Sequence, residues 1–385
     1  MSYQNQWSKS AVSDVVRQLR DTAIDSLARM YCLDRGLFAF TLRKRGREEV
    51  PEGVSRRYTA TVLIALAGED PQIAAEVLGG HSPEDVCTPL LEALDDAKDL
   101  GEVALTAWAA RALGHSKASM AMQALRRMEP GRRPYPTVEL SWALTAMVIG
   151  DGGTADIDQA LPTARALLAG FHADSGIFRH GSAQSRIRGL RAHVSCFADF
   201  VYPIHALSCY YLAMKDTRAV EVAARCAERM CELQGPQGQW WWHFDVRTGR
   251  VIEHYPVYAV HQDAMAPMAL FALAEACGRD HSASIEKGLQ WLVNPPENAG
   301  SLIDTERKVI WRKVARREPR RLVRGLQAAA SRLHPRLRLP AVDAFFPPVA
   351  IEYESRPYHM AWILHAWPAG HAVRIHEESS RLAIV

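Results

Sequence analysis

The chain has 385 residues, of which 48% are hydrophobic, so it is long enough to bury a large core in one big domain or two ordinary ones. It contains no run of about 18 apolar residues, which excludes a membrane-spanning helix, and its polar start carries no apolar signal segment. The formal net charge of +3 and seven scattered cysteines without a CxxC pair predict a reduced, cytoplasmic protein.

Apolar residues recur at helical spacing along most of the chain, in two kinds of segment. The first kind mixes apolar stripes with charge and covers residues 13–31, 82–97, 117–129, 156–171, 217–234 and 282–293. The second kind is apolar nearly all round and covers 56–68, 100–114, 135–150, 196–214, 260–278 and 356–367. A helix that is apolar on all sides is buried on all sides, so the alternation predicts two concentric rings of helices.

Six such pairs predict an all-α fold, a single (α/α)6 toroid over residues 1–385, with an open α-solenoid as the alternative. In a toroid the starts of the buried helices converge at one mouth of the central cavity, where helix N-termini favour anions. The polar and aromatic residues at these starts are therefore predicted to bind substrate or to act on it. They are Arg57, Tyr58, Tyr135, Glu139, Asp199, Tyr202, His205, His261, Asp263, Tyr358 and His359.

A basic loop at 179–193 precedes the fourth buried helix. Its arginines, among them Arg186, Arg188 and Arg191, are predicted to hold an anionic group of the substrate, because guanidinium groups bind diphosphates and carboxylates by paired hydrogen bonds. A solvated basic loop is the alternative.

Three adjacent tryptophans follow a glutamine-glycine turn in Q-G-P-Q-G-Q-W-W-W, residues 234–242. Gln234, Gly238 and Trp240 form the pattern Q-x-x-x-G-x-W, a basic-Gly-x-x-aromatic pattern follows at 287–292, and degenerate turns occur at 34–38 and 173–178. This pattern resembles the QW repeat of the squalene cyclase and prenyltransferase superfamily, whose members are α/α toroids. The resemblance implies that Trp240 is structural, and it leaves Trp241 and Trp242 to line the cavity or to pack in the core.

The resemblance to terpene cyclases implies an isomerase acting on an isoprenoid, free or as a diphosphate. Asp263 would then be the acid, His261 its modulator, and Tyr258, Tyr202, Trp241 and Trp242 the pocket lining. Resemblance to the prenyltransferases implies a zinc site, for which Cys196, Asp199 and His261 are the nearest match. No cofactor is expected on balance, with zinc and magnesium left open.

Two other functions fit the same residues. Toroids also build carbohydrate-active enzymes, and a hydrolase, lyase or epimerase for an anionic or lipid-linked glycan would use paired carboxylates. The candidates are Glu139, Asp199, Asp245, Asp263 and Glu354, with Tyr258, Tyr358, His261 and His359 suited to proton abstraction beside a uronate. A non-catalytic scaffold is the third possibility. An aromatic cavity would favour the isoprenoid, paired carboxylates in an open groove the glycan, and a filled ring centre the scaffold.

A basic insertion interrupts the last helix pair at 294–353. Residues 307–338 hold twelve Lys and Arg against one acid, Glu318, and two helical patterns broken at Pro319 place apolar stripes beside the cations. The stripes are Val309, Ile310, Trp311 and Val314, then Leu322, Val323, Leu326 and Leu333. This amphipathic pattern predicts docking on a membrane surface through 307–338, as a peripheral protein of the inner membrane, and no nucleic-acid partner is expected. An exposed helix over the ring is the alternative.

Overall fold

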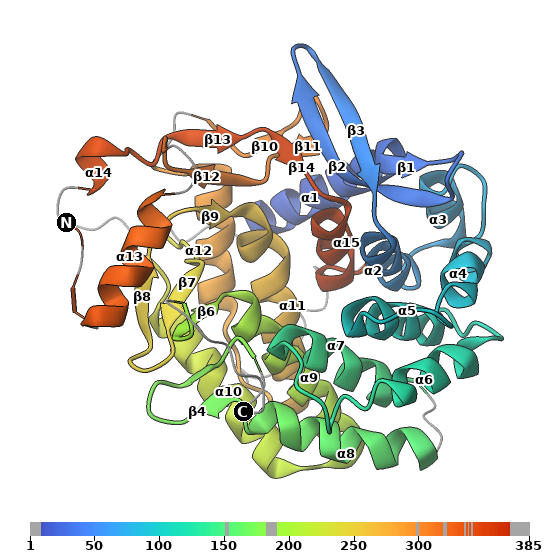
Figure 1. Cartoon of the computed structure of the whole chain (residues 1–385). Helices are drawn as coiled ribbons and strands as arrows, with labels where there is room; N and C mark the ends of the chain where they lie inside the picture. The colour runs from blue at the N-terminus through green and yellow to red at the C-terminus, as the bar shows by residue number, and fades with distance from the viewer. Residues whose placement is uncertain are drawn as a thin grey trace.

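Six buried helices form a closed ring in the computed structural model, which describes residues 9–150, 154–181, 191–297, 300–318, 322–334, 336–337, 339 and 342–369 (Figure 1). They are α2 (Arg56–Leu66), α5 (Leu100–Ala112), α7 (Thr137–Val148), α9 (Ala198–Met214), α11 (Ala266–Cys277) and α15 (Pro357–Ala366). Each packs against the next in this order, and α15 packs back against α2. The ring is therefore closed, as the toroid requires and an open solenoid does not.

A second set of helices surrounds this ring. It comprises α1 (Lys9–Met30), α4 (Pro83–Glu92), α6 (Ala118–Arg127), α8 (Thr154–Leu168), α10 (Thr217–Glu232) and α12 (Ser282–Val293). Each outer helix precedes an inner one, and α6 and α10 bury only one face, through residues such as Met122, Leu125 and Ala223. The expected (α/α)6 toroid is confirmed, and the sequence reading missed only the short α3 (Pro71–Val77) among the helices of the two rings.

Short antiparallel sheets, which the sequence did not suggest, join the helices. One contains β1 (Tyr31–Cys32), β2 (Leu37–Arg45), β3 (Glu48–Val54) and β14 (Glu354–Ser355); a second, β6 (Val194–Cys196), β7 (His243–Asp245) and β8 (Arg250–Glu253). A third joins β9 (Val257–Tyr258), β12 (Lys313–Ala315) and β13 (Ala350–Glu352), and two hairpins pair β4 (Phe171–His172) with β5 (Ile177–Phe178) and β10 (Ile303–Asp304) with β11 (Val309–Ile310). Their register is set by buried apolar positions such as Val257 and Val314, which lie opposite each other.

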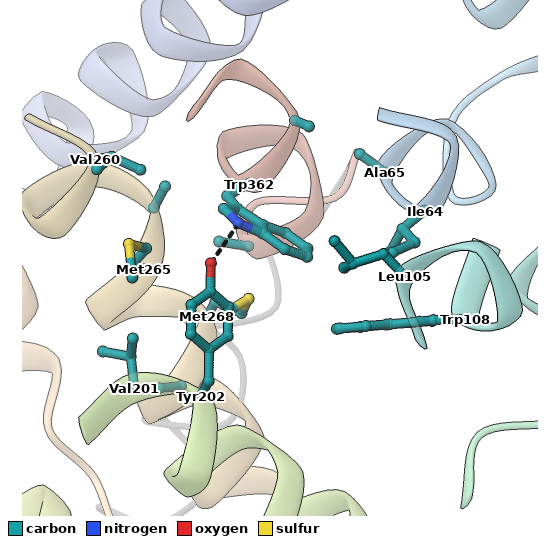
Figure 2. Packing of buried hydrophobic residues seen from close by; sticks show 14 of the residues in the cluster. Ile64, Ala65, Leu105, Trp108, Val201, Tyr202, Val260, Met265, Met268 and Trp362 are labelled. Atoms are coloured by element: carbon teal, nitrogen blue, oxygen red, sulfur yellow. Dashed lines mark hydrogen bonds between the residues drawn. The ribbon is translucent and has the colours of Figure 1, made fainter. Parts of the chain in front are cut away.

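Aromatic and sulfur-containing side chains fill the centre of the ring. Figure 2 shows Trp362 and Tyr202 facing each other there, with Trp108 and Met268 beside them, and the Trp362 indole N–H donates to the Tyr202 hydroxyl at 2.9 Å. Burying aromatic rings of this size contributes much of the core stabilisation, because each removes a large apolar area from water. At this depth the ring is a packed core, so any site must lie at the mouth.

The glutamine-glycine turn joins α10 to the tryptophans and packs on α12. The Gln234 amide donates to the carbonyls of Gly238 and Ser284, at 3.0 and 2.8 Å. Gly238 has φ of 99°, and a Cβ there would lie 2.0 Å from the Lys287 carbonyl oxygen. A Cβ on Gly288 would in turn lie 2.9 Å from the Trp240 indole nitrogen. The two partial motifs therefore pack against each other, and the structural role expected for Trp240 is confirmed by its burial.

The basic insertion folds differently from the prediction. Residues 309–315 form strands rather than a helix, and Val309, Ile310, Trp311 and Val314 are all buried in the core. Short apolar runs suit a buried strand as well as a helix, which is why the pattern misled. The five cations of residues 307–316 all pair with acids of the protein: Arg307 with Glu49, Lys308 with Asp25, Arg312 with Glu354, Lys313 with Glu352 and Arg316 with Glu253. The second helical pattern is confirmed as α13 (Leu322–Leu333), and a short helix, α14 (Val342–Phe345), follows it.

Candidate functional site at the mouth of the ring

The inner helices begin at one end of the ring, which we call the mouth, and the first turns of α2, α7, α9 and α15 carry polar side chains there. Contacts link these starts directly. Arg57 on α2 reaches Glu139 on α7 at 2.9 Å, and the rings of Tyr58 on α2 and Tyr358 on α15 lie 5.0 Å apart. The predicted convergence of Arg57, Tyr58, Glu139 and Tyr358 is therefore observed.

Asp199 and His180 form the most accessible acid-base pair. The Asp199 carboxylate is fully buried and accepts from the Cys196 backbone N–H at 2.8 Å and the Ser195 hydroxyl at 3.2 Å. His180 Nδ1 lies 3.0 Å from the same carboxylate, and half of the histidine side chain is exposed. The hydrogen bond to Asp199 and the negative charge of that carboxylate raise the pKa of His180. The half-exposed His180 side chain therefore connects the buried Asp199 carboxylate to solvent.

Glu139 is the second carboxylate beside His180. It occupies the first turn of α7, whose start is held by a hydrogen bond from the Thr137 N–H to the His180 carbonyl at 3.0 Å. Burial raises the pKa of Glu139, although the bond to Arg57 opposes that shift, and the charges of Glu139 and His180 each act on the other's pKa. Glu139 and Asp199 therefore start neighbouring inner helices with one histidine between them.

The insertion contributes Arg312 to the mouth, which the sequence reading assigned to a lipid-facing surface. Strand β12 pairs with β9, and the Ala259 N–H donates to the Arg312 carbonyl at 3.0 Å. The Arg312 guanidinium lies 5.2 Å from the centre of the Tyr258 ring and also bonds Glu354. Burial raises the pKa of Tyr358 to about 12, and the hydroxyls of Tyr258 and Tyr358 have no hydrogen-bond partner within the described residues. These groups form a cationic, hydrogen-bonding surface suited to a carboxylate.

The adjacent tryptophans separate at this point. The Trp242 ring meets Tyr258 edge-on at 5.0 Å and lies 4.7 Å under the Arg324 guanidinium of α13. Of the loop arginines Arg186, Arg188 and Arg191, the structure describes Arg191, which donates to the neighbouring His243 at 3.2 Å. Trp242 therefore belongs to the mouth, and Arg191 lies close to it. Trp241 was predicted to line the cavity or to pack in the core. It packs against the His254 ring and the turn at Gly235.

Asp263 and His359 form a separate, sealed pair. His359 Nε2 lies 2.8 and 2.9 Å from the two Asp263 oxygens, and both side chains are almost fully buried. Burial raises the pKa of Asp263, which His359 partly offsets. Asp263 lies in η1 (His261–Met265), a single turn of π-helix that precedes α11. Such turns are often found at functional sites. Its role as an acid stays a prediction.

The histidine next to that pair is also enclosed. His261 stacks on Phe197 with ring centres 4.3 Å apart, and burial lowers its pKa to about 3. It is therefore a neutral imidazole in the core, next to Tyr258 at 5.1 Å.

Several predicted residues lie away from the mouth or outside the residues that the structure describes. His205 lies deep in the ring, 5.4 Å from Trp108, because two further turns of α9 carry it inward. The Tyr135 hydroxyl donates to the Met128 carbonyl at 2.7 Å, so it serves the turn between α6 and α7. The Tyr202 hydroxyl accepts a hydrogen bond from the Trp362 indole N–H below the mouth. Arg186 and Arg188 lie outside the described residues.

The predicted zinc ligands are only partly brought together. Ligand atoms of Cys196 and Asp199 lie within 4.8 Å of each other and of His180, whereas His261 is not in this group. A Cys, a His and an Asp are an acceptable donor set for zinc. The same Asp199 oxygen already accepts three hydrogen bonds, so an ion would compete with these contacts.

His180 and Arg312 are the residues that the sequence reading did not single out. His180 lies in the basic loop, where two histidines among arginines were its only signal. Arg312 was hidden among the other cations of the insertion. A strand pairing between positions 55 residues apart brings it to Tyr258, and no local pattern reports that.

The fold and this site define an α/α toroid with carboxylates, cations and aromatic rings gathered at one mouth. Solved structures with the same fold include carbohydrate-active enzymes. An unsaturated glucuronyl hydrolase specific for heparin is 14% identical, with a TM-score of 0.61 over 94% of this chain and 98% of that one. A sugar epimerase from a ruminal bacterium is 10% identical, with a TM-score of 0.60 over 94% and 99%.

The unsaturated glucuronyl hydrolase of Bacillus sp. GL1, described as responsible for glycosaminoglycan degradation, is 12% identical with a TM-score of 0.57 over 91% and 96%. No family model and no curated protein matches the chain. At these identities the likeness shows the fold, and the predicted kinship with squalene cyclases and prenyltransferases receives no support from it.

Proposed function

We propose that this protein is a carbohydrate-active enzyme that hydrolyses an anionic, uronate-containing glycan, with Glu139 and Asp199 as its working carboxyl groups. The observation that carries the proposal is their placement on the first turns of the neighbouring inner helices α7 and α9, where the His180 ring bonds Asp199 and the His180 carbonyl bonds the start of α7. This was the alternative to the isoprenoid prediction. Paired carboxylates in an open groove were expected to favour the glycan enzyme, and a filled ring centre to favour a scaffold. An aromatic cavity for an isoprenoid finds no counterpart in the ring centre, which Trp108 and Trp362 fill.

The chemistry follows from the surroundings of each carboxyl group. Burial keeps more of Glu139 protonated than an exposed glutamate, so it suits the general acid that protonates the leaving oxygen. Asp199, joined to the half-exposed His180, suits the base that takes a proton from water. Arg312 with Tyr258 and Tyr358 suits the substrate carboxylate, and Trp242 offers a face for a sugar ring.

Structures with the same fold include variants at paired aspartates. Two glucuronyl hydrolase structures from Streptococcus agalactiae carry an asparagine at one or the other of two aspartates, 60 positions apart, and one of these holds an unsaturated glucuronyl disaccharide. Glu139 and Asp199 are also 60 positions apart.

The test is turnover of a panel of unsaturated uronyl disaccharides, followed by loss of the ultraviolet absorbance of the sugar double bond. We expect Asp199→Asn and Glu139→Gln each to lower kcat by about 10² to 10⁴, the usual contribution of a positioned acid or base. The control is Asp156→Asn, because Asp156 pairs with Arg111 and Arg126 on the outer side of the ring. Full activity in both mouth variants would refute the proposal.

An epimerase is the second candidate, and one observation favours it. The Arg312 guanidinium lies 5.2 Å from the Tyr258 ring, and a tyrosine beside a cation suits removal of the proton next to a uronate carboxylate. Incubation of intact uronate oligosaccharides in heavy water separates the two functions. An epimerase leaves deuterium at C5 without shortening the chain, whereas a hydrolase shortens the chain with no label at that carbon.

A further inference from the structure

The helix α13 is apolar on two opposite faces, and only one of them packs on the protein. Its inner face carries Val323 and Ala328, which are buried and pack toward β8. Ser331 on the same helix bonds His193 at 2.9 Å, and Arg247 donates to the Ser331 carbonyl at 2.6 Å. These contacts fix which side of α13 faces outward.

The outer face carries Leu322, Leu326 and Leu333, which we call the outer stripe. They are 48%, 54% and 83% exposed. At 100° per residue the three lie within about 40° of one another around the helix axis. Leu337 and Phe345, which follow the helix, are 45% and 75% exposed. A single exposed leucine is ordinary, but an aligned stripe marks an interaction surface.

The charge around the outer stripe indicates the partner. Residues 319–342 contain six arginines and no acid, and Arg332 and Arg336 are exposed beside the stripe. The next acid, Asp343, already pairs with Arg316 at 2.5 Å. A second copy of this surface would bring like charges together, which opposes self-association. An anionic surface that also takes up apolar side chains matches both features, and that is the description of an anionic lipid bilayer.

We propose that the outer stripe of α13 docks the protein on the surface of an anionic membrane, with the leucines in the interface and the arginines at the lipid headgroups. No helix among the described residues is long and apolar enough to cross a membrane, so the contact is interfacial. The docking surface is narrower than the predicted 307–338, because residues 309–315 are internal strands. The Arg324 guanidinium of the same helix reaches inward to lie 4.7 Å from the Trp242 ring, so α13 lies between the docking surface and the mouth.

The experiment is co-sedimentation of the full chain with vesicles of equimolar phosphatidylcholine and phosphatidylglycerol, and with vesicles of phosphatidylcholine alone. We expect binding to the anionic vesicles that weakens with added salt, and much weaker binding to the neutral ones. The double variant Leu326→Glu and Leu333→Glu should lower the partition coefficient by about tenfold or more, because two apolar side chains that would enter the bilayer interface become charged.

The matched control is Leu33→Glu, since Leu33 is 60% exposed on a turn after α1 rather than on α13. It should bind as the unaltered protein does, and both variants should keep the same melting temperature. Equal binding by the double variant and the unaltered protein, or no binding by the unaltered protein, would overturn the proposal. So would a dimer in light scattering that the double variant converts to a monomer, because a second copy would then cover the stripe.

Discussion

His180 holds its proton to higher pH than a free histidine does, because the buried Asp199 carboxylate lies 3.0 Å from its ring. The raised pKa means that this pair stabilises the folded protein fully below the unfolded pKa of about 6.5, and that the stabilisation is lost as pH rises through the folded pKa. The same loss of charge would change how the mouth holds an anion. The protonation of one half-exposed side chain thus couples stability to function.

This coupling is testable by nuclear magnetic resonance titration of the His180 ring. We expect its pKa to lie above that of free histidine and to fall in the Asp199→Asn variant, because the carboxylate that stabilises the charged ring is gone. In the Asp156→Asn protein the His180 titration should be unchanged, since that aspartate belongs to the outer ring. An unchanged His180 pKa in Asp199→Asn would show that the two side chains do not interact in solution.

At the scale of the element, the turn between α10 and the tryptophans depends on a glycine. Gly238 combines a φ of 99° with a space that a Cβ cannot enter, because the Lys287 carbonyl would lie 2.0 Å away. We expect Gly238→Ala to destabilise the fold by roughly 3 kcal/mol or more, the sum of backbone strain and overpacking. The free energy of unfolding in urea measures this effect.

Gly278 is the matched comparison for that turn. It ends α11 with a φ of 73°, yet nothing lies within 4 Å of its Cβ position. Gly278→Ala should therefore cost only the backbone term, about 1 to 2 kcal/mol. Equal losses in the two variants would mean that the close approach to α12 contributes nothing.

At the scale of the whole molecule, the last two inner helices of the ring meet where α15 packs on η1, just before α11. Asp263 and His359 span this junction, and the Trp367 indole N–H donates to the Asp263 carbonyl at 2.6 Å. Removing one member of a buried pair leaves the other without compensation. We expect Asp263→Asn to lower the free energy of unfolding by about 3 kcal/mol or more, measured in urea.

The same variant also tests the role that the sequence suggested for Asp263. If Asp263 is an acid in the reaction, the Asp263→Asn variant should lose turnover while it stays as stable as the unaltered protein. If Asp263 only stabilises the ring, the variant should lose stability, and its folded fraction should keep its turnover. We expect the second result, because both side chains are sealed from the mouth.

Much of this architecture could be predicted from residue order alone. The charged and the all-apolar segments specify outer and inner helices, because a helix in the inner ring has no side facing water. For the same reason, the starts of inner helices could be placed at one mouth, and Arg57, Tyr58, Glu139, Asp199 and Tyr358 were found there. How deep a residue lies in the ring was harder to predict, because His205 and Asp263 have the same kind of local sequence as residues at the mouth.

Only the tertiary structure decided where the insertion goes and which residues meet. Local sequence cannot distinguish a buried strand from an amphipathic helix over so short a run as Val309–Ile310, and the pairing of β12 with β9 joins residues far apart in the chain. That pairing turns Arg312 from a surface cation into part of the mouth, and a loop contact sets His180 against Asp199. The helical period determined the ring, because it reflects local burial; long-range pairing decided the site, because its free energy comes from contacts that exist only in the folded chain.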